Sequence, residues 1–363
     1  MSRTARERER GAQNRTAMMD TESIQKTRET SPWRFCVAPM MDWTDRHCRF
    51  FHRQLTRRAR LYTEMVSSAA IMHGDRQRLL GIHPIEHPIA LQLGGSDPEE
   101  LARASEIGLS FGYDEINLNC GCPSDRVQSG RFGACLMAEP ELVAACVAAM
   151  RCAVGGDAPV TVKCRIGIDD QNSEGDLVRF IERVAAGGCS TFIVHARKAW
   201  LQGLSPKENR EVPPLDYDRV HRLKAAFPEL TIVINGGIAT LHEAAAQLNA
   251  VDGVMLGRAA YKSPAILGDV DCTLFEDDCP PPLPYAVLEG MFGYVAGELE
   301  RGARLSSITR HMTGLLNGRL GARLFRRLLT EESVKAGAGL DVLRAAIEAA
   351  RRVEERPIGK LAA

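Results

Sequence analysis

The segment YDEINLNCGCPSDRVQSGR, residues 113–131, contains the pattern that decides the fold. It opens with apolar residues at alternate positions, Ile116 and Leu118, which is typical of a buried β-strand. The strand is expected to stop at a turn, because Gly121 gives the backbone conformational freedom and Pro123 lacks the N–H group that a ladder needs. The segment is therefore predicted to be a strand that ends in a Gly-Cys-Pro corner.

Polar side chains crowd the last positions of this predicted strand. Asn117 and Asn119 lie within it, and Cys120 and Cys122 lie at its end. Strand interiors rarely carry such residues, whereas strand ends that build a site do. The simpler alternative is a free cysteine near a turn, since cysteine is commonly buried for packing alone. The rest of the chain favours a site.

From residue 35 onward, short runs rich in valine and isoleucine alternate with amphipathic helical patterns. The predicted strands are Phe35–Met40, Leu61–Val66, Pro88–Leu93, Tyr113–Asn119, Val160–Ile166, Thr191–Ala196, Thr231–Asn235 and Val251–Leu256. The predicted helices between them are Pro98–Leu109, Pro140–Ala153, Ser173–Ala186, Leu215–Phe227 and Leu241–Asn249. Eight such units over about 230 residues indicate an α/β fold of the (β/α)8 TIM barrel type, which takes roughly 250. A doubly wound sheet is less suitable, because no G-x-G-x-x-G turn follows the first strand.

The barrel interpretation can be tested within the sequence, because TIM barrels build their sites at the carboxyl ends of the strands. The predicted strands have strongly polar residues or glycines at or near that end. These residues are Asp42, Glu64, Gln92, Cys122, Lys163, Arg165, His195, Arg197, Asn235, Gly236, Gly237, Gly257 and Arg258. Glycines after strands 7 and 8 of such barrels commonly hold a phosphate through backbone N–H groups. Tight turns are the alternative for these glycines.

The chain divides by composition into four segments. Residues 1–31 are polar, mix arginine with glutamate and are predicted to be a disordered extension. Residues 32–271 form the predicted barrel, residues 272–284 a proline-rich linker, and residues 285–363 a helical domain. No acidic residue occurs between Arg301 and Leu329, whereas arginine is frequent there. This block predicts a surface that binds a phosphate backbone.

The overall composition is that of an ordinary globular chain, with 363 residues, 45% hydrophobic content and a formal net charge of zero. The 11 cysteines show no metal-binding spacing, because the close pair Cys120 and Cys122 is separated by only one residue. We expect reduced thiols, no metal and a cytoplasmic location. No apolar run is long enough to span a bilayer, so no membrane contact is expected, and no obligate protein partner is evident.

Several motifs resemble those of the flavin-dependent tRNA-dihydrouridine synthases, and most closely their bacterial A subfamily. They are APMMDWTDR, ALQLGG, INLNCGCPSDRVQSGRFGACLM, VKCRIGID, FIVHARKAW, NGGI and GRAAY. The resemblance runs from about Pro32 to the C-terminal helices and implies an FMN-bearing TIM barrel followed by a helical domain that grips tRNA. It also implies reduction of uridine to 5,6-dihydrouridine in the D-loop of tRNA, at positions 20 and 20a, with FMN recharged by NADPH.

The resemblance implies roles for individual residues. Cys122 is the expected proton donor. The expected FMN contacts are Pro39, Met40, Met41, Gln92, Lys163, His195, Asn235, Gly236, Gly237, Gly257 and Arg258. The expected tRNA contacts are Asn119, Lys207, Arg210, Arg323 and Arg326, the last two being equal candidates for one RNA-contacting arginine. A thiol suits the acid role, because its ordinary pKa of about 8.5 leaves it protonated at neutral pH.

Other interpretations of these residues compete with the catalytic one. Lys163 could be a barrel lysine paired with Glu64, His195 a core histidine, and Arg323 and Arg326 solvated helix residues. At the level of function, the alternatives are an FMN barrel that reduces a free pyrimidine or an enone, an aldolase that uses Lys163 as a Schiff base, and a tRNA-binding factor without catalysis. The arginine-rich tail argues against the first, a bound flavin would exclude the second, and an intact Cys122 argues against the third.

Overall fold

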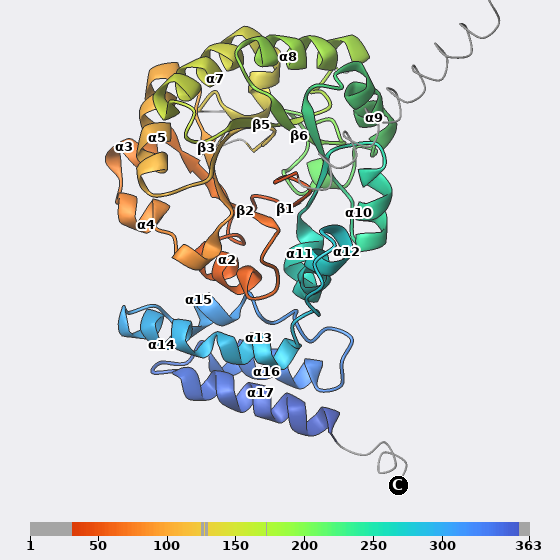
Figure 1. Ribbon diagram of the computed structural model, residues 1–363. Coiled ribbons are helices and arrows are strands. Elements are labelled where there is room, and N and C mark those ends of the chain that lie inside the picture. Colours follow the sequence, from red (N-terminus) through yellow and green to blue (C-terminus); the bar gives the residue numbers. More distant parts are fainter. Residues whose placement is uncertain (1–30, 125–126, 128–129, 172, 356–363) are drawn as a thin grey trace, which may run out of the picture.

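A computed structural model describes residues 31–124, 127, 130–171 and 173–355. The predicted N-terminal extension lies outside the described residues, apart from residue 31. The described chain forms two parts, a barrel surrounded by helices and a smaller set of helices beside it (Figure 1).

Eight parallel strands close into a barrel in sequence order, from β1 next to β2 round to β8 next to β1. Their bounds are β1 Phe35–Val37, β2 Arg60–Ser67, β3 Ile89–Gly94, β4 Glu115–Cys120, β5 Val160–Arg165, β6 Thr191–His195, β7 Thr231–Asn235 and β8 Gly253–Leu256. The prediction of a (β/α)8 barrel is confirmed. β1 ends before its predicted limit of Met40, because Ala38 makes the last ladder bond, to the Leu256 carbonyl, and Pro39 has no N–H to continue it.

Alternation along the strands separates two environments. On β4, Ile116, Leu118 and Cys120 belong to the main hydrophobic core between strands and helices. Glu115 and Asn119, at the intervening positions, bond to side chains of other strands across the barrel interior. Successive side chains of a strand point to opposite faces, so the polar residues of β4 line the inside of the barrel.

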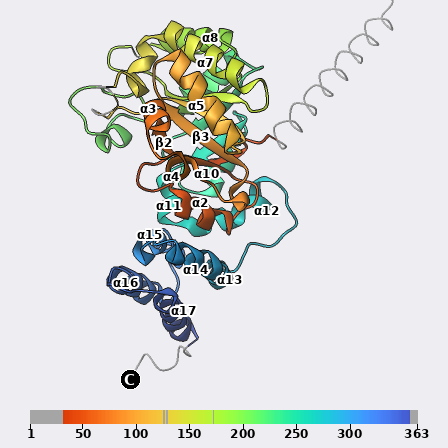
Figure 2. The same cartoon turned by 90° about the vertical axis from the view of Figure 1, so that its left-hand side faces the viewer.

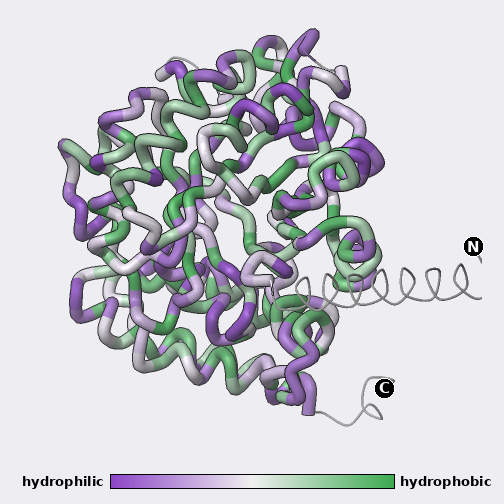
Figure 3. Tube along the Cα trace, turned by 45° about the horizontal axis from the view of Figure 1, so that its top comes forward, coloured by the Kyte–Doolittle hydropathy of each residue, from purple (hydrophilic) through white to green (hydrophobic). Residues whose placement is uncertain are grey.

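Helices cover the outside of the barrel (Figure 1). In sequence order, the α-helices of the barrel part are α2 Arg46–Arg53, α3 Ser68–His73, α4 Arg76–Leu80, α5 Pro98–Ser110, α7 Pro140–Val154, α8 Glu174–Ala186, α9 Tyr217–Ala226, α10 Leu241–Leu248, α11 Arg258–Lys262 and α12 Val270–Leu274. Short 3-10 helices are η1 Pro84–Glu86, η2 Gly133–Ala138, η3 Glu208–Arg210 and η4 Pro264–Asp269. Hydrophilic and hydrophobic segments alternate along the outer helices, as half-buried helices require (Figure 3). Asp97 and Asp216 cap α5 and α9, because the side chain of each accepts the backbone N–H three residues later.

The second part is helical and lies beside the barrel part, below α2 and α11 (Figures 1 and 2). Its helices are α13 Pro284–Gly290, α14 Phe292–Glu300, α15 Leu305–Thr309, α16 Ala322–Glu332 and α17 Leu340–Glu354. Residues 275–283, between α12 and α13, form neither helix nor strand. Among the described residues, no helix has both the length and the apolar character needed to cross a bilayer.

One carboxylate joins the two parts. Asp45 caps α2 by accepting the Cys48 N–H at 3.0 Å, and it also pairs with Arg310 at 2.6 Å and His311 at 3.0 Å. Burial alone would raise the pKa of Asp45, but its bonds to His311, to the Cys48 amide and to Arg310 hold that pKa well below its usual range. The ionised carboxylate therefore serves the barrel and the helical part together.

Aromatic rings pack around the same joint. Trp43 stacks on Tyr261 with ring centroids 4.4 Å apart, and the Tyr261 hydroxyl lies 3.1 Å from His311 Nδ1. Tyr294 of α14 stacks on Phe50 of α2 at 3.8 Å. Stacked rings of this kind add to the area that they bury, so the joint is a packed interface as well as an ionic one.

Candidate active site

The polar carboxyl ends of β5, β6 and β7 meet at the barrel mouth. Lys163, on β5, donates from Nζ to Asn235 Oδ1 at 3.0 Å, and Asn235 donates in turn to the Met255 carbonyl at 2.7 Å. His195, the last residue of β6, pairs in register with Asn235 and with Arg165. The structure thus brings together the residues that the strand-end pattern singled out. Lys163 does not pair with Glu64, whose carboxylate accepts the Asp42 N–H instead.

Burial sets the charge of these groups. Desolvation, with Arg165 nearby, lowers the pKa of Lys163 to about 8. Desolvation, reinforced by Arg165 and Lys163, also holds the pKa of His195 well below its usual range. At neutral pH the mouth therefore contains a lysine that gives up its proton easily and a neutral imidazole.

Cys122 sits in the corner that follows β4. Its backbone N–H and that of Gly121 both donate to Asn119 Oδ1 at 3.0 Å, which fixes the turn. Its thiol is partly buried and lies 3.5 Å from the Ser124 hydroxyl. Cys120 is fully buried in the core outside the barrel, so the two neighbouring cysteines lie in different environments and Cys122 is the one at the mouth.

Three cationic side chains interact electrostatically with Cys122: Lys163, Arg165 and Arg210. Arg165 is buried and forms no ion pair with any described residue, and burial lowers its pKa to about 10. A buried cation without a carboxylate is costly, so its position next to the thiol indicates a functional demand.

Arg165 also ties two loops together. Its Nε donates to the Gly121 carbonyl at 3.1 Å, and its Nη1 donates to the carbonyls of Lys198 at 3.1 Å and Asn209 at 2.8 Å. The guanidinium thus links the Cys122 corner to the loop that follows β6. The sequence pattern places Arg165 among the polar strand ends, and its position two residues after Lys163 puts both side chains on one face of β5, but the family resemblance assigns it no contact with FMN or tRNA.

The loop after β6 carries two of the predicted tRNA contacts. Asn209 is fully buried and holds the loop closed through bonds to Trp200 and to the Leu204 carbonyl. Lys207 and Arg210, on either side of it, are exposed. The buried asparagine therefore presents two exposed cations beside the barrel mouth.

The glycines after β7 form a tight backbone turn, which we call the cradle. Gly236 and Gly237 have φ values of +118° and +71°, which side-chain-bearing residues rarely adopt. A Cβ on Gly236 would lie 2.6 Å from the His195 ring, and one on Gly237 would lie 2.5 Å from Leu215. The Tyr217 hydroxyl donates to the Gly236 carbonyl at 2.6 Å, and Gly236 is buried whereas Gly237 is exposed. The turn therefore requires glycine at both positions, because a side chain at either would meet a neighbouring side chain.

Two arginines accompany this cradle. Arg258, directly after Gly257, forms an ion pair with Glu211. Arg197 is buried at Nε, and no described residue offers that atom a hydrogen-bond partner. Burial and the nearby Arg258 lower the pKa of Arg197. An unpaired buried N–H next to a second cation fits an anionic ligand such as a phosphate.

The remaining predicted contacts divide into exposed and buried ones. Pro39 and Met40 are half-buried after β1, and Met41 is 55% exposed. Gln92 is 1% exposed, and both atoms of its amide bond to Asn117 and Asn119. The predicted flavin contact of Gln92 therefore has to be made from a side chain that is already held in place.

The arginine-rich block of the helical part is only partly available. Arg301, Arg310 and Arg319 pair with Glu298, Asp45 and Glu354. Arg323 and Arg326 are exposed on α16, and neither pairs with a carboxylate in the part of the chain that the structure describes. The predicted phosphate-binding surface is thus reduced to the outer face of α16 and its surroundings.

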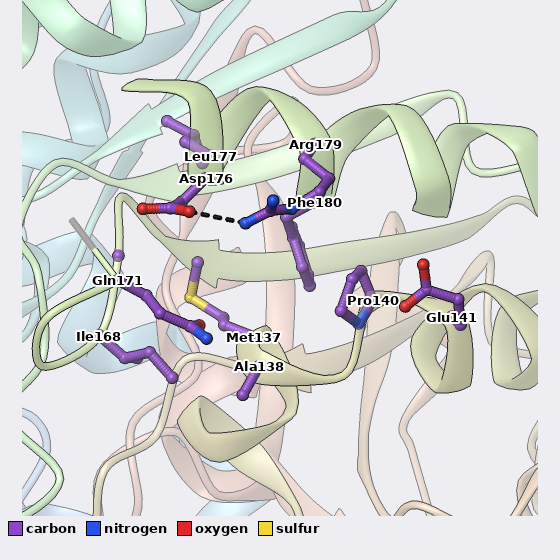
Figure 4. Close-up of a pocket in the computed structure, with 11 residues that line it drawn as sticks. Met137, Ala138, Pro140, Glu141, Ile168, Gln171, Asp176, Leu177, Arg179 and Phe180 are labelled. Carbon is purple, nitrogen blue, oxygen red and sulfur yellow. Dashed lines mark hydrogen bonds and ion pairs between the residues drawn. The ribbon is translucent and has the colours of Figure 1, made fainter. Parts of the chain in front are cut away.

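A pocket of about 180 Å³ opens elsewhere on the molecule, outside the barrel (Figure 4). Met137 of η2 and Phe180 of α8 form its apolar wall, and Asp176 pairs with Arg179 across its rim at 2.6 Å. None of the predicted site residues lines it. The pocket is separate from the mouth at which the strand ends meet.

Comparison with known proteins supplies the family. Residues 36–352 match the family model described as Dihydrouridine synthase (Dus). A relative from Vibrio parahaemolyticus, named tRNA-dihydrouridine(20/20a) synthase, is 56% identical over 319 residues, covering 88% of this chain and 97% of its own. Relatives of the same name from Shewanella oneidensis and Salmonella typhimurium are both 57% identical, covering 86% and 87% of this chain and 93% and 95% of their own.

These matches extend over both the barrel and the helical part. They confirm the resemblance that the cysteine segment and the loop after β6 predict, and they agree with the closed eight-stranded barrel. On the sequence, the fold and the arrangement of the mouth together, this chain belongs to the dihydrouridine synthase family.

Proposed function

We propose that the protein reduces uridine to 5,6-dihydrouridine in the D-loop of tRNA, at positions 20 and 20a, with FMN as bound cofactor and NADPH as reductant. The observation that carries this proposal is the Cys122 thiol, presented by the Asn119 turn at a barrel mouth with three cations around it. The names of the relatives support the substrate, and the cytoplasm is where we expect the protein to meet it.

The residues at the mouth fit FMN. The positive-φ glycines and the unpaired Arg197 Nε suit its single phosphate, with Gly257 and Arg258 alongside. Lys163 would lie beside the flavin ring, where a cation favours the anionic reduced form. Pro39, Met40 and Met41 would contact the ring, and His195, held neutral, would lie next to the cofactor without adding charge.

Saturation of the C5=C6 bond of uracil requires a hydride at C6 and a proton at C5. Reduced FMN supplies the hydride when it is bound. Cys122 Sγ would give its proton to C5 from the other side of the base. Proton donation leaves a thiolate, which Lys163, Arg165 and Arg210 stabilise electrostatically. The cations thus support the donor after it has acted.

The base must leave its stack to reach this mouth. Lys207 and Arg210 beside the mouth and Arg323 and Arg326 on α16 offer cations for the phosphates that flank an extruded nucleotide. Asn119 is 8% exposed and lies next to the thiol, so it is the side chain we expect to contact the uracil itself.

The test is dihydrouridine mapping in tRNA from a strain that lacks this gene. Complementation with the wild type should restore dihydrouridine at positions 20 and 20a, and Cys122→Ala should not. Cys152→Ala is the matched control, because Cys152 is exposed on α7, away from the mouth. Unchanged dihydrouridine in the deletion strain, or full restoration by Cys122→Ala, would refute the proposal.

A further inference from the structure

A buried carboxylate closes the lower end of the barrel interior. Glu115 begins β4 and is fully buried. It accepts hydrogen bonds from Trp33 Nε1 and from the Tyr62 hydroxyl, both at 2.7 Å, and from the Thr161 hydroxyl, and it pairs with Arg60 at 3.3 Å. Three hydrogen-bond donors and one ion-pair partner thus hold one carboxylate in a fixed position.

A line of hydrogen bonds leaves this carboxylate through Thr161 and rises inside the barrel. Asn117 Nδ2 donates to Thr161 Oγ1 at 2.7 Å, and Gln92 Nε2 donates to Asn117 Oδ1 at 2.8 Å. Strand register places these side chains opposite one another, since Asn117 pairs with Gln92 on β3 and with Thr161 on β5. All three residues are at most 1% exposed.

The line continues to the Cys122 corner. Asn119 Nδ2 donates to Gln92 Oε1 at 2.8 Å, and Asn119 Oδ1 accepts the N–H groups of Gly121 and Cys122 at 3.0 Å. The hydrogen bonds therefore connect the carboxylate at the base of the barrel with the backbone of the expected proton donor, without interruption. We call this line the Glu115 chain; its side-chain members are Glu115, Thr161, Asn117, Gln92 and Asn119.

Both ends of the Glu115 chain require its hydrogen bonds to donate in the same direction, toward Glu115. A carboxylate only accepts, so the Thr161 hydroxyl must donate downward and can only accept from Asn117. Backbone N–H groups only donate, so Asn119 must turn its oxygen toward Gly121 and Cys122. Reversing any amide in between would set two donors or two acceptors against each other. The orientation of each amide is therefore fixed from both ends of the chain, by the Glu115 carboxylate below and by the two backbone N–H groups above.

We propose that Glu115 and Thr161 are positioning residues for Cys122, acting through this chain to hold Asn119 with its oxygen toward the corner. The proposal rests on the proposed function, in which Cys122 is the proton donor. It has a consequence for the base. The bonds to Gln92 and to the corner use one Nδ2 hydrogen and the Oδ1 atom of Asn119, and they leave its second Nδ2 hydrogen for the base. A hydrogen-bond donor at this place matches a uracil carbonyl rather than a cytosine amino group.

The chain can be cut at Thr161 without changing side-chain shape. Thr161→Val removes the hydroxyl, whereas Thr161→Ser keeps it. The first readout is hydrogen–deuterium exchange of the peptide that contains Gly121 and Cys122, which needs neither cofactor nor substrate. Losing about one hydrogen bond's worth of local protection should speed exchange of these amides roughly tenfold in Thr161→Val. Thr161→Ser should exchange like the wild type.

A matched control separates the chain from a general core defect. Val162→Ala changes the neighbouring residue on β5, which is fully buried in the outer core, and should leave exchange at Gly121 and Cys122 unchanged. If Thr161→Val does not fold, Thr161→Ala gives the same comparison with a smaller side chain. Wild-type amides that exchange as fast as an exposed loop, or a Thr161→Val protein with wild-type exchange, would overturn the proposal.

The second readout is kinetic. Reoxidation of the reduced flavin by tRNA should slow roughly 10–100-fold in Thr161→Val, because a small misplacement of a reacting group has effects of this size. Reduction of the flavin by NADPH and the KM for tRNA should stay at wild-type values. Faster exchange without slower reoxidation would show that the chain does not position the donor. An inactive wild type would refute the proposed function alone, because the exchange experiment still tests the chain.

Discussion

Replacing Gly236 with alanine tests whether the turn after β7 is the cofactor cradle. The added Cβ would lie 2.6 Å from His195 Cδ2 and 3.0 Å from Nε2, inside the 3.4 Å at which ordinary contacts begin. The residue also has φ of +118°, which alanine rarely adopts. The His195 ring and the backbone of the turn must therefore both move.

A second glycine separates the cost of backbone strain from the cost of the contact with His195, because it has a positive φ but no close neighbour. Gly112, before β4, has φ of +92° and nothing within 4 Å of an added Cβ. Backbone strain of this kind costs about 1–3 kcal/mol at either position. Each kcal/mol lowers Tm by about 2–4 °C in a domain of 150–250 residues, and somewhat less in a larger one. Only Gly236→Ala should also disturb the mouth.

The assay is FMN titration of the two variants, followed by flavin fluorescence, together with thermal unfolding. Gly112→Ala should lose stability and keep the wild-type Kd for FMN. Gly236→Ala should bind FMN at least about tenfold more weakly, which corresponds to about 1.4 kcal/mol. A wild-type Kd in Gly236→Ala would place the FMN phosphate elsewhere and refute the cradle.

Three further predictions concern the reaction and the RNA. In Cys122→Ala, NADPH should reduce the flavin at close to the normal rate while reoxidation by tRNA slows about 10²–10⁴-fold; rapid mixing that shows slow reduction would make the residue a cofactor support. Raising the pH through about 8 neutralises Lys163, so the rate of flavin reduction should fall above that pH in the wild type if it depends on this cation. In Lys163→Gln the rate should not change across this pH range. A fall that persists in the variant would show that another group causes the pH dependence. Removing Arg323 or Arg326 should flatten the salt dependence of tRNA binding by about 1 per phosphate contact, whereas Arg301→Ala should change it less, because Arg301 is paired with Glu298; equal slopes in all three variants would move the RNA surface away from α16.

The barrel could be predicted from the sequence because its signal is local and repeated. β7 has the predicted bounds Thr231–Asn235, and α10 differs from its prediction only at the last residue. Two predicted boundaries were wrong: β1 ends before Pro39, which has no N–H to continue the ladder, and β8 begins at Gly253 rather than at Val251. Strand ends that carry polar residues located the mouth, since parallel strands of a barrel all end on one side.

Contacts between distant residues could not be read from the sequence. Arg165 lies two residues after Lys163, but its bonds to the Gly121 and Asn209 carbonyls depend on how two loops fold over the barrel. The Glu115 chain likewise depends on the register of three strands, which no local pattern specifies. Family resemblance assigns roles to single residues, whereas these features are contacts between residues that are distant in the sequence.

The carboxylate at Asp45 has a consequence for protein engineering. It serves the start of α2 in the barrel and also Arg310 and His311, which lie more than 260 residues further along the chain. A chimera that joins this barrel to the helical region of another relative must transfer the acid together with both basic partners, or it will leave a charge without its counterpart on each side of the seam. The unit that can be exchanged between relatives is therefore set by this joint, and a cut made only within residues 275–283 would divide it.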